Sequence, residues 1–99
     1  MYEQLMELDT NVITTARATM DTKQVDLENL KAIQEAGLEV CDNLDRCIDD
    51  EILDDTQSLR LKLQVLLVPT HLDPFSVLCS LVSMSDKIQN ILTAFEDQD

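Results

Sequence analysis

The chain has 99 residues, enough for one domain with a modest core, because a domain of this size buries about two-thirds of the surface of its unfolded chain. Hydrophobic residues make up 44% of the sequence, aromatic residues only 3%, and there is one glycine. An all-β domain needs glycine and proline at its turns and relies on aromatic and β-branched residues, so this composition excludes a β-sandwich or β-barrel. The sequence predicts an all-α protein, a small helical bundle or coiled-coil hairpin that forms a single interaction domain over residues 1–99.

Twenty acidic residues against seven basic ones give a net charge of −13. This charge repels nucleic-acid phosphates and anionic lipid surfaces, so we expect no direct binding to nucleic acid or membrane. The first residues do not resemble a signal peptide, and no apolar stretch approaches the roughly 20 residues that span a bilayer. The three cysteines, Cys41, Cys47 and Cys79, are an odd set without close pairing, which favours a reducing compartment. We therefore expect an intracellular protein, cytoplasmic or nuclear, whose partner is another protein.

Apolar residues recur at helical spacing through the first 48 residues, and two interpretations fit them. In the first, a helix pair, the chain breaks near residues 21–24 and Asp26 caps the second helix. The buried stripe of its first helix would be Leu5, Leu8, Val12, Ala16 and Met20. In the second, one unbroken helix from about residue 3 to 48 carries a coiled-coil seam. The two heptad positions of that seam would hold Tyr2, Asp9, Ala16, Lys23, Leu30, Gly37 and Leu44, and Met6, Ile13, Met20, Leu27, Gln34, Cys41 and Ile48.

Gly37 lies inside this apolar pattern, where a glycine costs about 1 kcal/mol relative to alanine. Two explanations fit it. The missing side chain lets a neighbouring helix approach closely, or the glycine marks a kink or a helix end.

Residues 39–55 hold eight acidic residues and one basic residue. Aspartate favours helix caps over helix interiors, so we expect one helix to end and another to begin within 49–55. The second element would span about 56–68 with Asp54, Asp55 or Thr56 as its N-cap. No window here contains a glycine, which argues against an EF-hand loop, and we expect no metal. The run is either a solvated capping segment or a docking patch for a basic partner, formed by Asp42, Asp45, Asp49, Asp50, Glu51, Asp54 and Asp55.

Residues 58–68 are ambiguous, because Leu59, Leu61, Leu63 and Val65 alternate with polar residues as in a half-buried strand. The chain offers no second strand, so a strand here would pair with another molecule. The same residues are good helix formers, and we favour a helix that is buried on most sides, by the bundle or by a partner. Pro69 would end it, and residues 70–72 would form a short loop.

The clearest helix start is Asp73 followed by Pro74, because aspartate suits the N-cap and proline the first helical position. Apolar residues then keep a spacing of four and three residues, which predicts a helix over 74–95. A short connection places this helix antiparallel to the preceding element. The polar residues 96–99 would form a frayed acidic tail.

Catalytic residue combinations are missing from the sequence, since its one histidine, His71, lies in an expected loop. We expect no enzyme, no cofactor and no small-molecule substrate. The main hypothesis is a helical adaptor or a subunit of a multiprotein assembly, as a homodimer or within a hetero-complex, whose apolar seams pair with partner helices. The expected interface is Leu30, Ile33, Val40, Leu44, Leu81, Met84, Ile88 and Ile91.

The same eight positions would equally suit the core of a single chain. An alternative function follows from the charge: an acidic inhibitor or chaperone could mask a basic surface on a target protein, for example a nucleic-acid-binding surface.

Overall fold

The computed structural model describes residues 1–46 and 49–97 and contains four α-helices. They are α1 (Tyr2–Thr22), α2 (Leu27–Leu44), α3 (Asp50–Val65) and α4 (Pro74–Asp97). One turn of 3-10 helix, Pro69–His71, lies between α3 and α4. Within the described residues there is no β-strand. The prediction of an all-α protein, formed as a small helical bundle, is confirmed.

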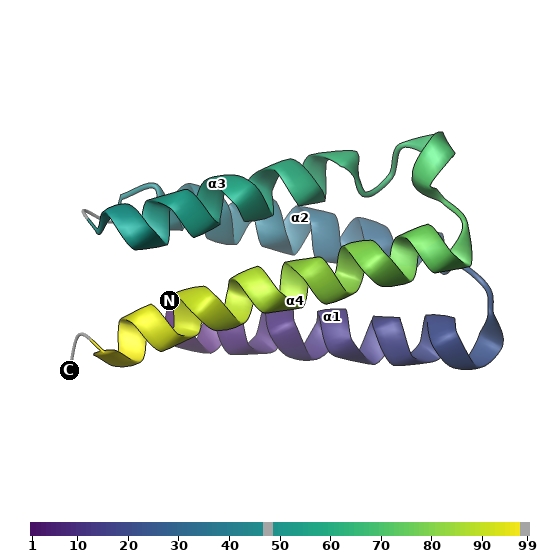
Figure 1. Ribbon diagram of the computed structural model, residues 1–99, viewed down its shortest axis with the longest axis horizontal. Helices are drawn as coiled ribbons and strands as arrows, with labels where there is room; N and C mark the ends of the chain where they lie inside the picture. The colour runs from purple at the N-terminus through teal and green to yellow at the C-terminus, as the bar shows by residue number, and fades with distance from the viewer. Residues whose placement is uncertain (47–48, 98–99) are drawn as a thin grey trace.

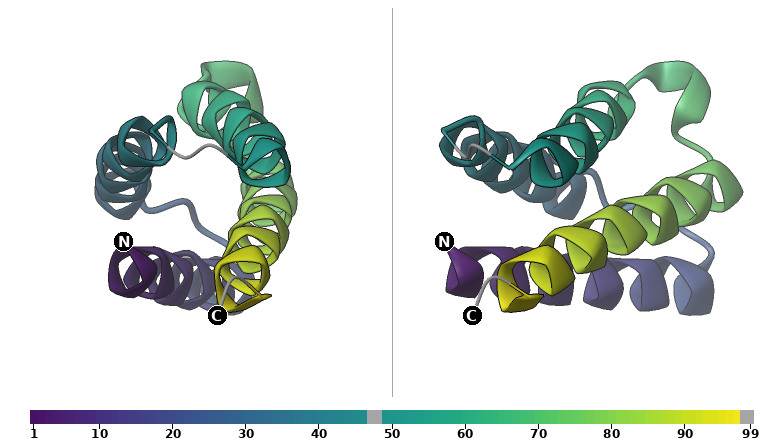
Figure 2. Two further views of the ribbon diagram at one scale, coloured as in Figure 1. Left: turned by 90° about the vertical axis from the view of Figure 1, so that its left-hand side faces the viewer. Right: turned by 60° about the vertical axis from the view of Figure 1, so that its left-hand side comes forward.

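The four helices form an up-and-down bundle in which each helix runs antiparallel to the next (Figure 1). α1 packs against α2 and α4, and α3 packs against the same two helices, so the four surround one core (Figure 2). The beginning of α1, the end of α2, the beginning of α3 and the end of α4 lie together at one end of the bundle, which we call the terminal end (Figure 1). The bundle measures 40 × 21 × 17 Å.

The N-terminal half is a helix pair, and the interpretation as one unbroken helix is wrong. α1 ends where Lys23 adopts the left-handed conformation, with φ of 55°, and its N–H donates to the carbonyl of Thr19. α2 begins at the expected cap, since the carboxylate of Asp26 accepts from the N–H of Asn29 at 3.2 Å. A rod of 45 residues would be about 68 Å long, well beyond the bundle's length. The second helix ends at Leu44, and residue 48, its expected end, lies outside the described residues.

The buried stripe of α1 differs from the expected one at a single position. Leu5, Leu8, Val12 and Ala16 are buried as predicted, but Met20 is 57% exposed. Its neighbour Thr19 is buried instead, and the hydroxyl of Thr19 donates to the carbonyl of Thr15 at 2.8 Å, which satisfies its polar atom inside the helix.

Gly37 lies buried inside α2, which continues to Leu44. The explanation as a helix end is therefore wrong, and the close approach of a neighbouring helix is confirmed, because the side chain of Leu63 on α3 covers Gly37.

α3 begins earlier than expected, and Asp49 is its N-cap in place of Asp54, Asp55 or Thr56. The carboxylate of Asp49 accepts from the N–H groups of Glu51 at 2.9 Å and Ile52 at 3.3 Å. Ile52 and Thr56 are fully buried, so the apolar face of α3 extends through the acidic segment. Burial of this face explains why the helix includes residues that have low helix propensity.

The ambiguous segment is helical up to Val65, which confirms the helix and excludes the strand. It ends three residues before the expected limit of 68, and Pro69 opens the 3-10 turn that replaces the expected loop. Within the chain this helix is only partly buried, since Leu59 and Leu63 are fully buried but Leu61 and Val65 are exposed. The bundle alone therefore does not provide the expected burial on most sides, which would require a partner.

α4 begins at Pro74 as predicted, and the carboxylate of Asp73 accepts from the N–H of Ser76 at 3.0 Å. The helix continues to Asp97, two residues past its expected end, and the hydroxyl of Tyr2 on α1 donates to the carboxylate of Glu96. Residues 98–99 of the expected tail lie outside the described residues.

Candidate protein-binding surfaces

His71, the one histidine of the sequence, lies exposed in the 3-10 turn. Among the residues that the structure describes, no group of three or more His, Cys, Asp or Glu side chains is arranged to hold a metal ion. None of the described helices is both long enough and apolar enough to cross a membrane. Two features of the surface are candidates for binding a partner, an apolar groove and a charged end of the bundle.

The eight residues expected at a partner interface all face the interior of the single chain. They come from α2 and α4, and none is more than 5% exposed: Leu30, Ile33, Val40, Leu44, Leu81, Met84, Ile88 and Ile91. They form part of the core of the single chain, which is the alternative that the sequence allowed for these positions. A partner would reach them only if the bundle opened.

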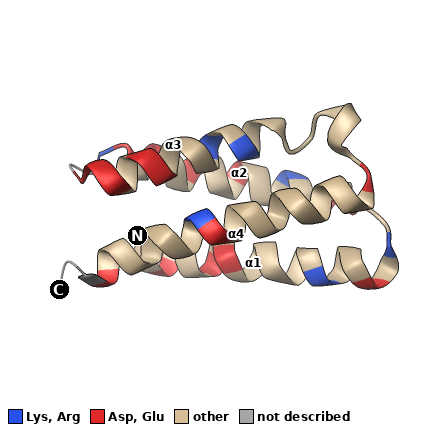
Figure 3. Cartoon of the chain, viewed as in Figure 1, with Lys and Arg blue, Asp and Glu red and all other residues tan. Residues whose placement is uncertain are grey.

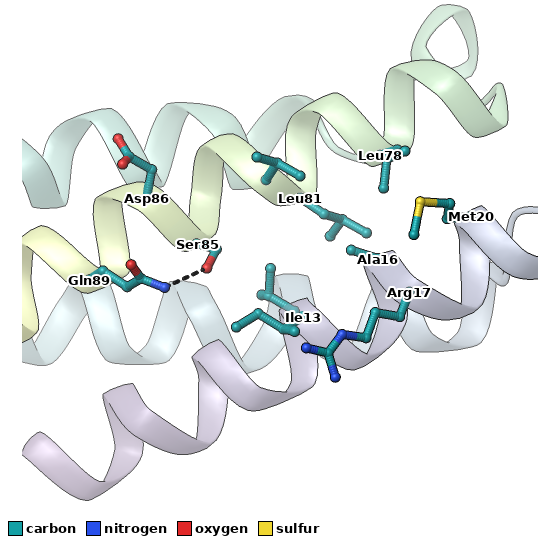
Figure 4. A pocket seen from close by; sticks show the side chains of 11 residues that line it. Ile13, Ala16, Arg17, Met20, Leu78, Leu81, Ser85, Asp86 and Gln89 are labelled. Carbon is teal, nitrogen blue, oxygen red and sulfur yellow. Dashed lines mark hydrogen bonds between the residues drawn. The ribbon is translucent and has the colours of Figure 1, made fainter.

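An apolar groove runs along the outside of the bundle between α1 and α4, and we call it the α1–α4 groove (Figure 4). Its volume is about 450 Å³. On the α1 wall, Met20 is 57% exposed, and on the α4 wall, Val82 is 59% exposed. The complete lining is Val12, Ile13, Ala16, Arg17, Met20, Leu78, Leu81, Val82, Ser85, Asp86 and Gln89.

One polar contact joins the two walls of the groove. The hydroxyl of Ser85 on α4 donates to the carboxylate of Asp9 on α1 at 2.7 Å. Within α4, the amide of Gln89 donates to the same Ser85 hydroxyl at 3.4 Å (Figure 4). Because these contacts lie within one folded chain, the groove is formed before any partner binds. Arg17 and Asp86 flank it, and neither forms an ion pair with any other described residue.

One apolar pattern predicted for the coiled-coil seam lies on the surface of α1 instead, partly in the groove. Met6, Ile13 and Met20, one heptad position of the supposed unbroken seam, lie outside the core. Met6 and Met20 are exposed, and Ile13 is partly exposed in the groove. α1 therefore has two apolar faces, one buried in the bundle and one on its surface. The signal was present in the sequence, since two apolar stripes of different phase fit the same 22 residues.

The seven residues of the expected acidic patch lie around the α2–α3 corner, and several already have partners within the chain. Arg60 on α3 binds Asp42 at 2.9 Å and Asp45 at 2.6 Å. Asp55 lies 3.9 Å from the ammonium of Lys87, and Asp49 caps α3.

The other three residues of the patch, Asp50, Glu51 and Asp54, are exposed. They form no ion pair with a described residue, so theirs is the part of the patch whose charge is not offset within the chain.

The fold concentrates the negative charge at the terminal end, beyond what the acidic run alone provides (Figure 3). The described residues nearest this end are 1–12, 36–46, 49–57 and 86–97, with 14 acidic and two basic residues. The opposite half comprises residues 13–35 and 58–85, with five acidic and five basic residues. This polarity could not be predicted from the sequence, because it requires the antiparallel arrangement that brings the beginning of α1 and the end of α4 close to the end of α2 and the beginning of α3.

No protein-family model, curated protein or solved structure matches the chain.

Proposed function

We propose that the protein is a non-enzymatic helical adaptor, or a subunit of a multiprotein assembly, that binds a protein partner in the α1–α4 groove. The observation that carries this proposal is the exposure of apolar side chains on two adjacent helices, with Met20 and Val82 both more than half exposed. A contiguous apolar surface of this kind is typical of a site that another protein covers.

The groove suits an apolar helix face better than a small polar ligand. Full burial of an exposed Val, Ile or Met side chain contributes about 1.5–3 kcal/mol. A partner helix that covers Ile13, Met20 and Val82 would gain part of this free energy from each of the three side chains. Helix-in-groove recognition uses anchors spaced like those of one helix face. The walls are connected by the Asp9–Ser85 hydrogen bond, so little ordering energy is lost when a partner binds.

The proposal places the protein in a reducing compartment, the cytoplasm or the nucleus. The free thiol of Cys41, buried in the core, supports this assignment, because it packs there as a small apolar group.

Site-specific photocrosslinking in cells tests the proposal. A photoreactive amino acid replaces Val82 in the groove or, as a control, Glu35, which is exposed on α2. We expect protein adducts from position 82 that are lost when Met20→Asp is added, and no such adducts from position 35. Equal adducts from both positions, or adducts that survive Met20→Asp, would contradict the proposal.

A second candidate function is an acidic inhibitor or chaperone that masks a basic surface on its target. The charge polarity of the bundle favours it, because 14 of the 20 acidic residues lie in the half nearest the terminal end. Such a surface accelerates association with a basic protein and makes the affinity depend on salt.

An arginine-rich peptide is the probe for this second function. Its affinity is expected to fall steeply between 50 and 300 mM NaCl and to weaken when Asp50, Glu51 and Asp54 are replaced by their amides. The matched control replaces Asp21, Glu28 and Glu35, three acidic residues of the opposite half. Binding that is independent of salt, or weakened equally by both triple variants, would exclude the terminal end as the site.

A further inference from the structure

We propose that the partner in the α1–α4 groove is a second copy of this chain, related by a two-fold axis that passes beside Ile13 and makes the two α1 helices antiparallel. The inference rests on the proposed function and names its partner. Three features of α1 and of the whole bundle support it.

The first feature is the spacing of the exposed apolar side chains of α1. Met6 and Met20 each lie seven residues from Ile13 and on the same side of the helix. In an antiparallel pair centred on Ile13, this residue meets its own copy, and Met6 lies level with Met20 of the second molecule. A two-fold interface requires such self-complementarity, because each contact occurs twice.

The second feature is the distribution of charge along the same helix. Three acidic residues precede Ile13, whereas two basic residues and one acidic residue follow it within α1 and its C-cap. Asp9 and Arg17 are both four residues from Ile13, and Glu3 and Lys23 are both ten residues from it. Antiparallel pairing therefore brings opposite charges to the same level at both distances, whereas parallel pairing would align acidic residues with acidic residues.

The third feature is the charge polarity of the bundle. Two chains of −13 repel each other, and a parallel dimer would place both acidic terminal ends together. Antiparallel association places them at opposite ends of an assembly whose subunits are 40 Å long. This length is several times the Debye length of about 8 Å at physiological salt, so the repulsion between the two acidic ends is largely screened.

The first test measures mass. Light scattering after size exclusion, in reducing buffer over a range of concentrations, is expected to give about twice the chain mass of 11.2 kDa. Ile13→Asp and, independently, Met20→Asp are expected to raise the dissociation constant of the dimer at least tenfold without loss of helical circular dichroism. Met20 is 57% exposed, so its substitution leaves the core intact even if that of Ile13 does not.

The second test fixes the orientation by disulfide formation, with each linkage identified by peptide mass. Ile13→Cys is expected to link to its own copy, whereas Ala18→Cys, exposed elsewhere on α1, is not. Met6→Cys and Met20→Cys are expected to link to each other when mixed. Links between two copies of Met6→Cys would overturn the antiparallel arrangement.

Two further results would overturn the inference and separate it from the proposed function. A chain that stays monomeric at every concentration, while position 82 crosslinks to a different protein, would remove the second copy and leave the groove as a binding site. A chain that stays monomeric and gives no groove-specific adducts would overturn both this inference and the proposed function of the groove.

Discussion

A Cβ atom on Gly37 of α2 would lie 2.7 Å from Cδ1 and 2.8 Å from Cδ2 of Leu63 on α3. Leu63 is fully buried, and its carbonyl oxygen accepts from the side-chain amide of Gln34 at 2.8 Å. The glycine therefore lets α2 and α3 approach closely, and the Gln34 bond fixes the two helices relative to each other at the same place. Close approach improves the packing that holds α3, whose own propensity for helix is modest.

Gly37→Ala is expected to lower the free energy of unfolding by about 1 kcal/mol. Alanine gains about 1 kcal/mol of helix propensity, but the added methyl group forces Leu63 out of its place, and overpacking of a core costs about 1–3 kcal/mol. Urea denaturation measures the net effect. In a Leu63→Ala background the clash is gone, so the same substitution should be stabilising. A stabilised Gly37→Ala single variant would contradict the close approach.

The local helix signals were predictable from the sequence because each depends on a few neighbouring residues. Asp26 and Asp73 have carboxylates that accept from N–H groups in the first turn of the following helix, and both caps were identified. The N-cap of α3 was not identified from the sequence, since Asp49, Asp54 and Asp55 are chemically equivalent as caps. The burial of Ile52, a tertiary property, selects Asp49.

The candidate site was harder to predict than the fold. Met20 fits both apolar stripes of α1, and only the position of α4 decides which stripe faces the core. The charge polarity of the bundle likewise depends on the antiparallel order of all four helices. Sequence periodicity identifies apolar faces, but it does not say which of them another helix of the same chain covers.

Arg60→Gln is expected to destabilise the bundle by about 0.5–1 kcal/mol at low salt and by less in 1 M NaCl. The guanidinium bridges Asp42 and Asp45, so its removal leaves two carboxylates next to each other in the most acidic part of the chain. Salt screens this repulsion. Lys62→Gln is the control, because Lys62 forms no ion pair with a described residue. Equal effects of the two substitutions would show that the Arg60 bridges contribute nothing specific.

The thiol of Cys41 is expected to resist alkylation in the folded protein. Burial raises its pKa from the ordinary 9.0 to about 11, so its thiolate fraction at pH 8.5 is roughly 75-fold lower than that of an ordinary thiol. Cys79 is exposed and should react first, with both sites followed by mass spectrometry. In denaturant the two rates should converge, and equal rates in the folded protein would contradict the burial.

The same shift predicts a dependence of stability on pH. The folded state holds the Cys41 proton more tightly than the unfolded state does, so this contribution is fully present below pH 9 and is lost as the pH rises through 11. A Cys41→Ala variant should show a smaller loss of stability between pH 8.5 and 10.5 than the wild-type chain.

Asp73→Ala is expected to lower the melting temperature at neutral pH and to have less effect in acid. Hydrogen bonds from Ser76 lower the pKa of the Asp73 carboxyl, so its contribution is present above the ordinary aspartate pKa and is lost as the pH falls through the lowered value. Thermal unfolding from pH 7 to pH 2 measures the difference in melting temperature between each variant and the wild type. Asp73→Asn keeps a hydrogen-bond acceptor but does not titrate, so its difference should be small and should change less with pH. If the difference for Asp73→Ala did not narrow in acid, the cap would be contradicted.

Ile88→Asp is expected to unfold the chain at every concentration, whereas Val82→Asp on the same helix is expected to leave it folded. Ile88 is fully buried, and an unpaired carboxylate there costs more than a domain of this size can lose. Val82 is 59% exposed in the α1–α4 groove, so its substitution affects association only. Far-ultraviolet circular dichroism measures folding, and light scattering measures mass. If Ile88→Asp kept its helical signal and lost only a partner, Ile88 would belong to an interface between chains, and the closed four-helix core would be wrong.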